Sequence, residues 1–204
     1  MRALSSTIFA TPKSRRIGVL YSFKNDFDNA IKYYGDFIAV VKDDKVRQTD
    51  AYLRLGDCNF ISAKYWPAMD AYNKAIELDP LMANAYGNRA NAYRNTKKYK
   101  EAIDDYDKSI EIKPNDAKTY HNRGTAKRDL QDLIGAMADY NISIKLDPSD
   151  GICYYKRANL KNDYKDYNGA ITDFNKAIEL IPNYAEAFLN RGMVLGFQKK
   201  IQKH

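Results

Sequence analysis

Apolar and small side chains recur along this chain at intervals of 34 residues. One column is aromatic and contains Tyr52, Tyr86, Tyr120, Tyr154 and Phe188. Three more columns share this period, namely Gly56, Ala90, Gly124, Ala158 and Gly192; Ala68, Ala102, Ala136 and Ala170; and Tyr72, Tyr106, Tyr140 and Phe174. A period of this length predicts similar structural units that stack on one another.

Prolines mark the boundaries of these units. Pro80, Pro114, Pro148 and Pro182 are again 34 residues apart. Each ends a segment such as "DYDKSIEIKP" and precedes a segment such as "AKTYHNRG", and we expect both segments to be helical. Because proline cannot continue a helix, it ends the second helix of one unit before the next unit begins. The pattern therefore predicts two helices, A and B, in each unit.

With this period and these columns, the chain resembles the tetratricopeptide repeat family. The resemblance implies an all-α fold, a right-handed superhelical solenoid of five helix pairs plus a terminal helix. The predicted repeats and terminal helix occupy 11–44, 49–82, 83–116, 117–150, 151–184 and 185–200. We expect one repeat domain over 11–204, preceded by a basic, disordered leader at 1–10.

The columns also predict how the helices pack. The small column lets helix A approach helix B closely, and the aromatic columns fill the space between pairs. Each pair alone leaves an apolar face open, so stability comes from stacking neighbours. Arginine recurs at Arg89, Arg123, Arg157 and Arg191, and aspartate at Asp105, Asp139 and Asp173. We expect repeated ion pairs, either within one repeat or with the preceding repeat.

The net charge of +7 does not indicate a nucleic-acid-binding protein. Seven of the 33 basic residues lie in the tails, 1–16 and 199–204, which contain no acid, so the rest of the chain has 26 basic and 26 acidic residues. A nucleic-acid-binding protein is expected to gather its basic residues on a folded face. No apolar run has the roughly 18 residues that a membrane span needs. The start lacks the apolar core of a secretory signal, and the cytoplasm is the favoured compartment.

The sequence contains no recognisable catalytic, cofactor-binding or metal-binding motif. His121 and His204 are the only histidines, and no glycine-rich phosphate loop or zinc-binding histidine pair occurs. Cys58 and Cys153 are the only cysteines, and they lie about three repeats apart. We therefore expect no internal disulfide, no metal site, no cofactor and no enzymatic activity.

The resemblance implies that the A helices line a concave groove that binds partner proteins. Asparagines at 84, 88, 91 and 95 fall on one helix face, although asparagine is a poor helix former. Side chains at groove positions of the family make up the candidate binding site: Asn84, Asn88, Asn91, Arg94, Asn95, His121, Asn122, Arg128, Tyr155, Lys156, Asn159 and Asn190.

Two interpretations of the asparagines remain open. An amide can bond both the C=O and the N–H of one peptide unit, so a ladder of amides can hold an extended chain. Alternatively, asparagine is only a tolerated polar residue at exposed positions. The family's clamp for chaperone carboxylate ends matches at Asn91 and Asn122, but Gly87 and Ile152 replace its two lysines. Without these charges, we do not expect carboxylate binding.

The sequence therefore predicts a non-catalytic scaffold that binds an extended peptide or partner segment in the groove. The alternative is a self-associating structural module, or a fragment of a larger repeat protein, with no groove ligand. The terminal helix is apolar on more than one side, with Phe188, Met193, Leu195 and Phe197 among its residues. This pattern predicts a possible homo-oligomer through the C-terminal helix.

Overall fold

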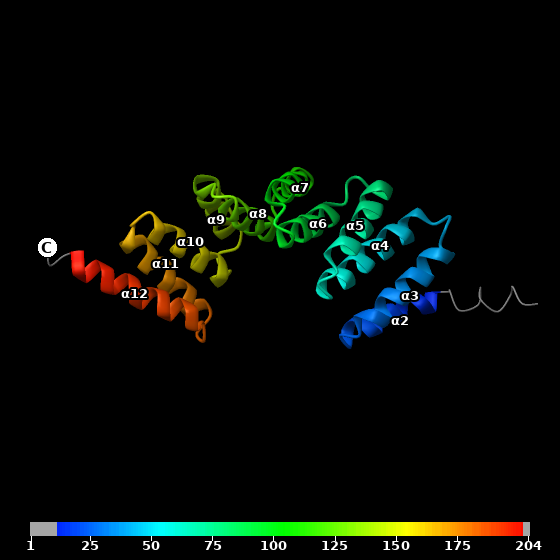
Figure 1. Cartoon of the computed structure of the whole chain (residues 1–204), viewed down its shortest axis with the longest axis horizontal. Helices are drawn as coiled ribbons and strands as arrows, with labels where there is room; N and C mark the ends of the chain where they lie inside the picture. Colours follow the sequence, from blue (N-terminus) through cyan, green and yellow to red (C-terminus); the bar gives the residue numbers. More distant parts are fainter. Residues whose placement is uncertain (1–11, 202–204) are drawn as a thin grey trace, which may run out of the picture. The chain divides into compact units, whose positions relative to one another are not determined.

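The computed structural model describes residues 12–201, and the predicted leader at 1–10 lies outside this range. Within it the chain forms eleven helices and no strand (Figure 1). The helices are α2 (Pro12–Phe23), α3 (Phe27–Val40), α4 (Lys45–Ile61), α5 (Tyr65–Leu78), α6 (Ala83–Asn95), α7 (Tyr99–Ile112), α8 (Ala117–Asp129), α9 (Leu133–Leu146), α10 (Gly151–Asp163), α11 (Tyr167–Leu180) and α12 (Ala185–Ile201). The predicted all-α fold is confirmed.

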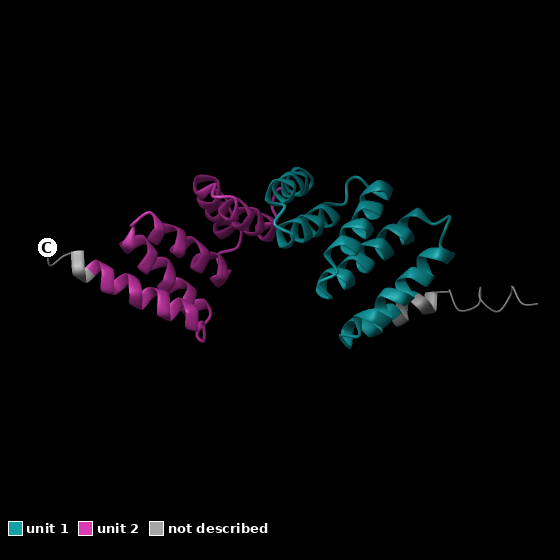
Figure 2. Cartoon of the chain, viewed as in Figure 1, with its two compact units in different colours: residues 1–113 teal, residues 114–204 magenta. Residues whose placement is uncertain are grey.

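The helices alternate between the two predicted kinds. The A helices are α2, α4, α6, α8, α10 and α12, and the B helices are α3, α5, α7, α9 and α11. The chain divides into two compact units, residues 1–113 and residues 114–204 (Figure 2). We describe each unit by itself. The predicted extent of a single repeat domain over 11–204 stays a prediction.

The same kind of turn joins helix A to helix B in all five pairs. Its residue with positive φ is Asn25, Ala63, Lys97, Gln131 or Lys165, with φ between 55° and 68°. Aspartates at 26, 132 and 166 then cap the following B helix by accepting a backbone N–H. Lys45–Gln48, which separates the first two predicted repeats, forms the first turn of α4, because the Asp44 side chain caps the helix there.

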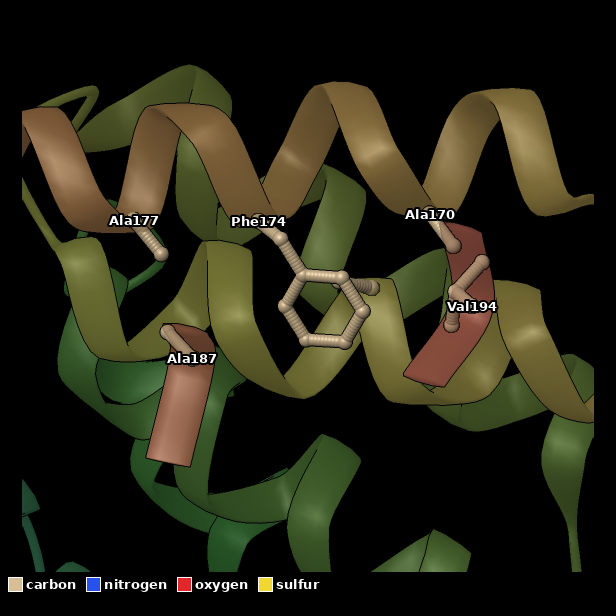
Figure 3. Close-up of a cluster of buried hydrophobic side chains, with 6 residues drawn as sticks. Ala170, Phe174, Ala177, Ala187 and Val194 are labelled. Carbon is tan, nitrogen blue, oxygen red and sulfur yellow. The ribbon is translucent and has the colours of Figure 1, made fainter. Parts of the chain in front are cut away.

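The core consists of alanines and aromatic rings where consecutive helices meet. In the second unit, Phe174 of α11 is fully buried with Ala170 and Ala177. Ala158 of α10 and Ala187 and Val194 of α12 also belong to this cluster, and Figure 3 shows the Phe174 ring between the two α12 residues. The small side chains let the helices approach closely enough for one ring to fill the remaining space.

The small column has the predicted role. A Cβ added to Gly124 would lie 3.0 Å from the Tyr140 ring, and one added to Gly56 would collide with the Tyr72 ring. Gly or Ala therefore provides the room in which the aromatic ring of helix B packs against helix A.

The arginines form the predicted ion pairs within their own repeats, and they also bond an asparagine of the preceding repeat. Arg89 donates from Nε and Nη2 to the two carboxylate oxygens of Asp105 in its own repeat, at 2.7 and 2.6 Å. Its Nη1 donates to Asn73 Oδ1 of the preceding repeat at 2.7 Å. Arg157 bonds Asp173 and Asn141 in the same way. Each of these arginines thus joins two consecutive B helices.

Both cysteines, Cys58 and Cys153, are free and buried. None of the helices that the structure describes is both long and apolar enough to cross a membrane.

Candidate functional site

In the first unit, the candidate surface is formed by side chains of α4 and α6 that bond to one another. Asn88 of α6 donates from Nδ2 to Asp57 Oδ1 of α4 at 2.8 Å. The hydroxyl of Tyr72 donates to the same oxygen at 2.9 Å. One turn further along α6, Asn91 Oδ1 accepts a hydrogen bond from Tyr106 OH at 2.6 Å. These bonds tie the A helices to each other and to the B helices behind them.

The second unit repeats this arrangement with different residues. Asn190 of α12 donates from Nδ2 to Asn159 Oδ1 of α10 at 2.8 Å and to Tyr155 OH at 3.1 Å. The bond from Asn190 to Asn159 and the bond from Asn88 to Asp57 both span 31 residues. On α8 the acceptor is Thr125 Oγ1, which accepts a hydrogen bond from the Tyr140 hydroxyl at 3.3 Å.

These bonds fix which atom of each amide remains available. Because Asn88 uses its Nδ2, its carbonyl oxygen is left as an acceptor. Because Asn91 uses its Oδ1, its NH₂ group is left as a donor. Asn190 and Asn159 form an equivalent acceptor and donor in the second unit. No described residue bonds these four remaining atoms, and all four side chains are half-buried.

The other predicted residues differ in their surroundings. Asn95 is exposed and donates to the backbone oxygen of Asn91 at 2.8 Å, and Asn84 is exposed at the start of α6. Arg94, Asn122, Arg128 and Lys156 are half-buried on their A helices. The Tyr155 ring lies 4.7 Å from that of Tyr184 and 5.9 Å from that of Phe174, so much of its surface packs against the core.

His121 belongs to a cluster that the sequence did not predict. Its Nδ1 lies 2.8 Å from Asp150 Oδ2, and Cys153 Sγ completes a group of three side chains whose ligand atoms lie within 4.8 Å of one another. These are metal-ligand types, and Asp150 also has a structural role. Asp150 caps α10 by accepting from the N–H groups of Ile152 and Cys153, at 3.0 Å each.

The hydrogen bonds of this cluster also affect the pKa values of its members. Burial raises the pKa of the Cys153 thiol to about 11. Burial alone would raise the pKa of Asp150, but the bonds from His121 and the backbone outweigh it and lower that pKa. Through these bonds the cluster caps α10 and joins it to α8.

The tyrosine hydroxyls bond A-helix side chains, a role that the sequence pattern did not predict. The pattern predicts packing for the aromatic column, yet the hydroxyls of Tyr72, Tyr106 and Tyr140 each donate to a residue 15 positions earlier. The signal was available, because tyrosine rather than phenylalanine fills this column in three of its four places. A buried hydroxyl requires a partner.

The helix pairs, their period and the stacked A helices define a helical repeat protein. Two family models described as tetratricopeptide repeat match the chain. One matches residues 83–116, and the other matches residues 16–39, 49–80 and 117–150. A model described as TPR repeat matches residues 163–196. The chain belongs to the tetratricopeptide repeat family.

Solved structures of other repeat proteins have the same fold. A MamA structure from Desulfovibrio magneticus RS-1 is 19% identical, with a TM-score of 0.75, and the match covers 86% of this chain and 97% of that one. YrrB, described as a TPR protein with an unusual peptide-binding site, is 17% identical, with a TM-score of 0.70 and coverage of 88% and 91%. The fold class predicted from the sequence, a tetratricopeptide solenoid, is confirmed.

A third structure contains a bound peptide. The first TPR of Spaghetti (RPAP3), bound to the HSP90 peptide SRMEEVD, is 26% identical, with a TM-score of 0.56. The match covers 57% of this chain and 93% of that chain. A search of curated protein sequences finds no match to this chain.

Proposed function

We propose that this protein is a non-catalytic scaffold that binds an extended partner segment along its A helices. The observation that carries the proposal is the fixed orientation of the amides. In each unit one asparagine keeps a carbonyl oxygen and another keeps an NH₂ group, because the other polar atom of each amide is bonded within the protein. An acceptor and a donor held in place match the N–H and C=O groups of an extended peptide backbone.

Rigid amides favour binding because the protein loses little side-chain freedom when the partner arrives. Asn91 is held by Tyr106, and Asn159 is held by Asn190, so their NH₂ groups are already oriented in the free protein. Contacts of this kind recognise the backbone of a partner rather than its side chains. The related structures described as a peptide-binding protein and as a peptide complex support a ligand of this class.

The test removes the donors and leaves the framework bonds in place. Asn91→Asp and Asn159→Asp keep an oxygen that can accept from Tyr106 and Asn190, as Asp57 accepts from Tyr72 and Asn88 in α4. Random twelve-residue peptides displayed on phage are selected on the wild-type chain, and the selected peptides are measured by calorimetry. We expect the double variant to bind them about 5- to 150-fold more weakly, since each lost hydrogen bond contributes about 0.5–1.5 kcal/mol.

Two controls make the result specific. Asn115→Asp adds one negative charge, as each single substitution does, at an exposed position between α7 and α8 and should leave affinity unchanged. N-methylation of single backbone amides in the peptide should weaken binding more than alanine substitution of its side chains. Equal affinity of the wild type and the double variant would contradict the proposal. So would a loss of binding in the double variant that high salt fully restores, because the loss would then arise from the added charge.

A further inference from the structure

The terminal helix α12 carries the A-helix face that helix B covers in the five preceding pairs. We call Phe188, Arg191, Gly192 and Leu195 the open A face, because they occupy the positions that meet helix B. The small column residue at this place is buried in α4, α6, α8 and α10. Gly192 is exposed, and a Cβ added to it would meet no atom within 4 Å. Phe188 and Leu195 are 44% and 37% exposed.

Arg191 shows what kind of group this face accepts. Its Nη1 bonds Asn175 of the preceding B helix at 2.6 Å, as Arg89 bonds Asn73 and Arg157 bonds Asn141. Its guanidinium lies 5.3 Å from the centre of the Phe188 ring, and the three other arginines lie 5.3–5.5 Å from the equivalent tyrosine rings. Arg191 therefore has the orientation that its counterparts use to bind aspartate.

The carboxylate partner distinguishes the other three arginines from Arg191. Nε and Nη2 of Arg89, Arg123 and Arg157 each bond the two oxygens of one carboxylate, at 2.6–2.9 Å. No carboxylate among the described residues bonds Nε and Nη2 of Arg191. A bidentate arginine–carboxylate pair is both strong and geometrically specific, so this edge selects an acidic partner.

The three B helices that lie opposite Arg89, Arg123 and Arg157 define the complete pattern of that partner. Their buried residues include Ala102, Asp105, Tyr106 and Ser109 in α7; Ala136, Asp139, Tyr140 and Ser143 in α9; and Ala170, Asp173, Phe174 and Ala177 in α11. The shared pattern is a small residue, aspartate, an aromatic residue and a small residue at i, i+3, i+4 and i+7. These positions lie on one face of a helix.

We propose that the open A face binds an amphipathic helix of a partner protein that carries this pattern. The aspartate bonds the free edge of Arg191, and the aromatic ring enters the space above Gly192. The contacts at this face favour a partner protein over a second copy of this chain. Its own segments with the pattern are engaged, with Asp105, Asp139 and Asp173 at most 6% exposed. Two open A faces packed against each other would bring two arginines together without a carboxylate.

The test uses the whole chain and a probe taken from its own α7. A labelled, acetylated and amidated peptide with the sequence of residues 98–113 contains the full pattern, and its binding is followed by fluorescence anisotropy. We expect saturable binding that Asp105→Asn in the peptide weakens about tenfold or more, because the bidentate bond is lost. This peptide variant leaves the protein, and hence its folding, unchanged.

A protein variant locates the binding. Gly192→Leu fills the space above the open A face and should abolish binding of the peptide. Gly35→Leu makes the same change at an exposed glycine of α3, where an added Cβ also meets nothing within 4 Å, and should bind as the wild type does. Circular dichroism checks that both variants fold.

Three results would overturn the proposal. The first is a failure of the wild-type chain to bind the peptide, and the second is equal binding by Gly192→Leu. The third is a concentration-dependent mass in sedimentation that Gly192→Leu abolishes, since a second copy would then be the occupant. Peptides selected for the A-helix amides should still bind Gly192→Leu, so the outcome is independent of the proposed function.

Discussion

The helix pairs α4–α5 and α6–α7 have the same fold but differ in what lies between helix A and helix B. In α6–α7 the half-buried Arg89 meets the buried Asp105. In α4–α5 the residues 34 positions earlier are Leu55 and Ala71, so both members of the ion pair are replaced together. Leu55 and Ala71 line an open hollow of about 610 Å³ that also contacts Asn73. The fold therefore accepts either a complete ion pair or none.

A helix pair with only one of these two charged residues would be unfavourable. Two paired charges offset much of the cost of burying them, and an apolar pair avoids that cost. A single charge left in the same place has neither advantage. Burial alone would lower the pKa of Arg89, but the Asp105 carboxylate outweighs burial and raises it. Burial raises the pKa of Asp105, and the hydrogen bonds and charge of Arg89 oppose that rise, so removing Arg89 removes what offsets the burial of this carboxylate.

The largest effect is expected when one member of the pair is removed. Arg89→Leu, which introduces the residue of α4–α5, should lower the free energy of unfolding by about 3–5 kcal/mol at neutral pH. The Asp105 carboxylate would then be buried without a partner. Urea unfolding followed by circular dichroism measures the change. A loss below about 1 kcal/mol would show that water reaches Asp105 and that the comparison with α4–α5 does not hold.

The matched control completes the replacement. Arg89→Leu with Asp105→Ala recreates the α4–α5 combination in α6–α7, and we expect it to recover most of the stability lost in the single variant. The double-mutant cycle should then give a coupling energy of about 2 kcal/mol or more between the two positions. Additive losses would mean that the two side chains stabilise the pair independently.

A second difference between the pairs lies in the small column. Ala90 of α6 is fully buried and its Cβ is accommodated, whereas a Cβ added to Gly56 of α4 would collide with the Tyr72 ring. Gly56→Ala should therefore lower the free energy of unfolding by about 1–3 kcal/mol, although alanine is the better helix former by roughly 1 kcal/mol. Exposed Gly192→Ala in α12 is the control and should be neutral or stabilising. A more stable Gly56→Ala variant would show that Tyr72 moves aside at little cost.

Much of this fold could be predicted from the sequence because the same requirements recur in every repeat. Pro114 ends one helix pair, and Gly124 and Tyr140 fit together within the next, and each has a counterpart 34 residues away. The first turn of α4 could not be placed in this way, since Lys45–Gln48 has no counterpart in the other repeats. Local capping by Asp44 decides it instead.

The candidate site was harder to predict because its bonds join residues that are far apart in the sequence. Helical spacing reveals the asparagine stripe on α6 and predicts either a ligand ladder or tolerated polar residues. The structure adds a third role, in which Asn88 bonds Asp57 and Asn91 bonds Tyr106. Such partners come from a neighbouring helix, and helical spacing along one segment does not reveal them.

The smallest expected effect concerns the acceptor at the A-helix surface, which is Asp57 in α4 and Asn91 in α6. Both accept a tyrosine hydroxyl, at 2.9 Å from Tyr72 and 2.6 Å from Tyr106, but only Asp57 is ionisable. Burial raises the pKa of Asp57, although the bonds from Tyr72 and Asn88 and the charge of Arg54 oppose this rise. The folded chain therefore holds this proton more tightly than the unfolded chain does.

The raised pKa of Asp57 makes stability depend on pH. As pH rises above the ordinary carboxyl pKa, the unfolded state loses its proton first, so stability falls until pH exceeds the raised pKa. Asp57→Asn keeps an oxygen for Tyr72 and Asn88 and removes this cost. We expect the variant to melt at a higher temperature than the wild type at pH 7 and at the same temperature near pH 3. Thermal unfolding of both proteins across this pH range measures the difference, and a variant that melts lower at pH 7 would show that the ionised carboxylate stabilises α4 against its neighbours.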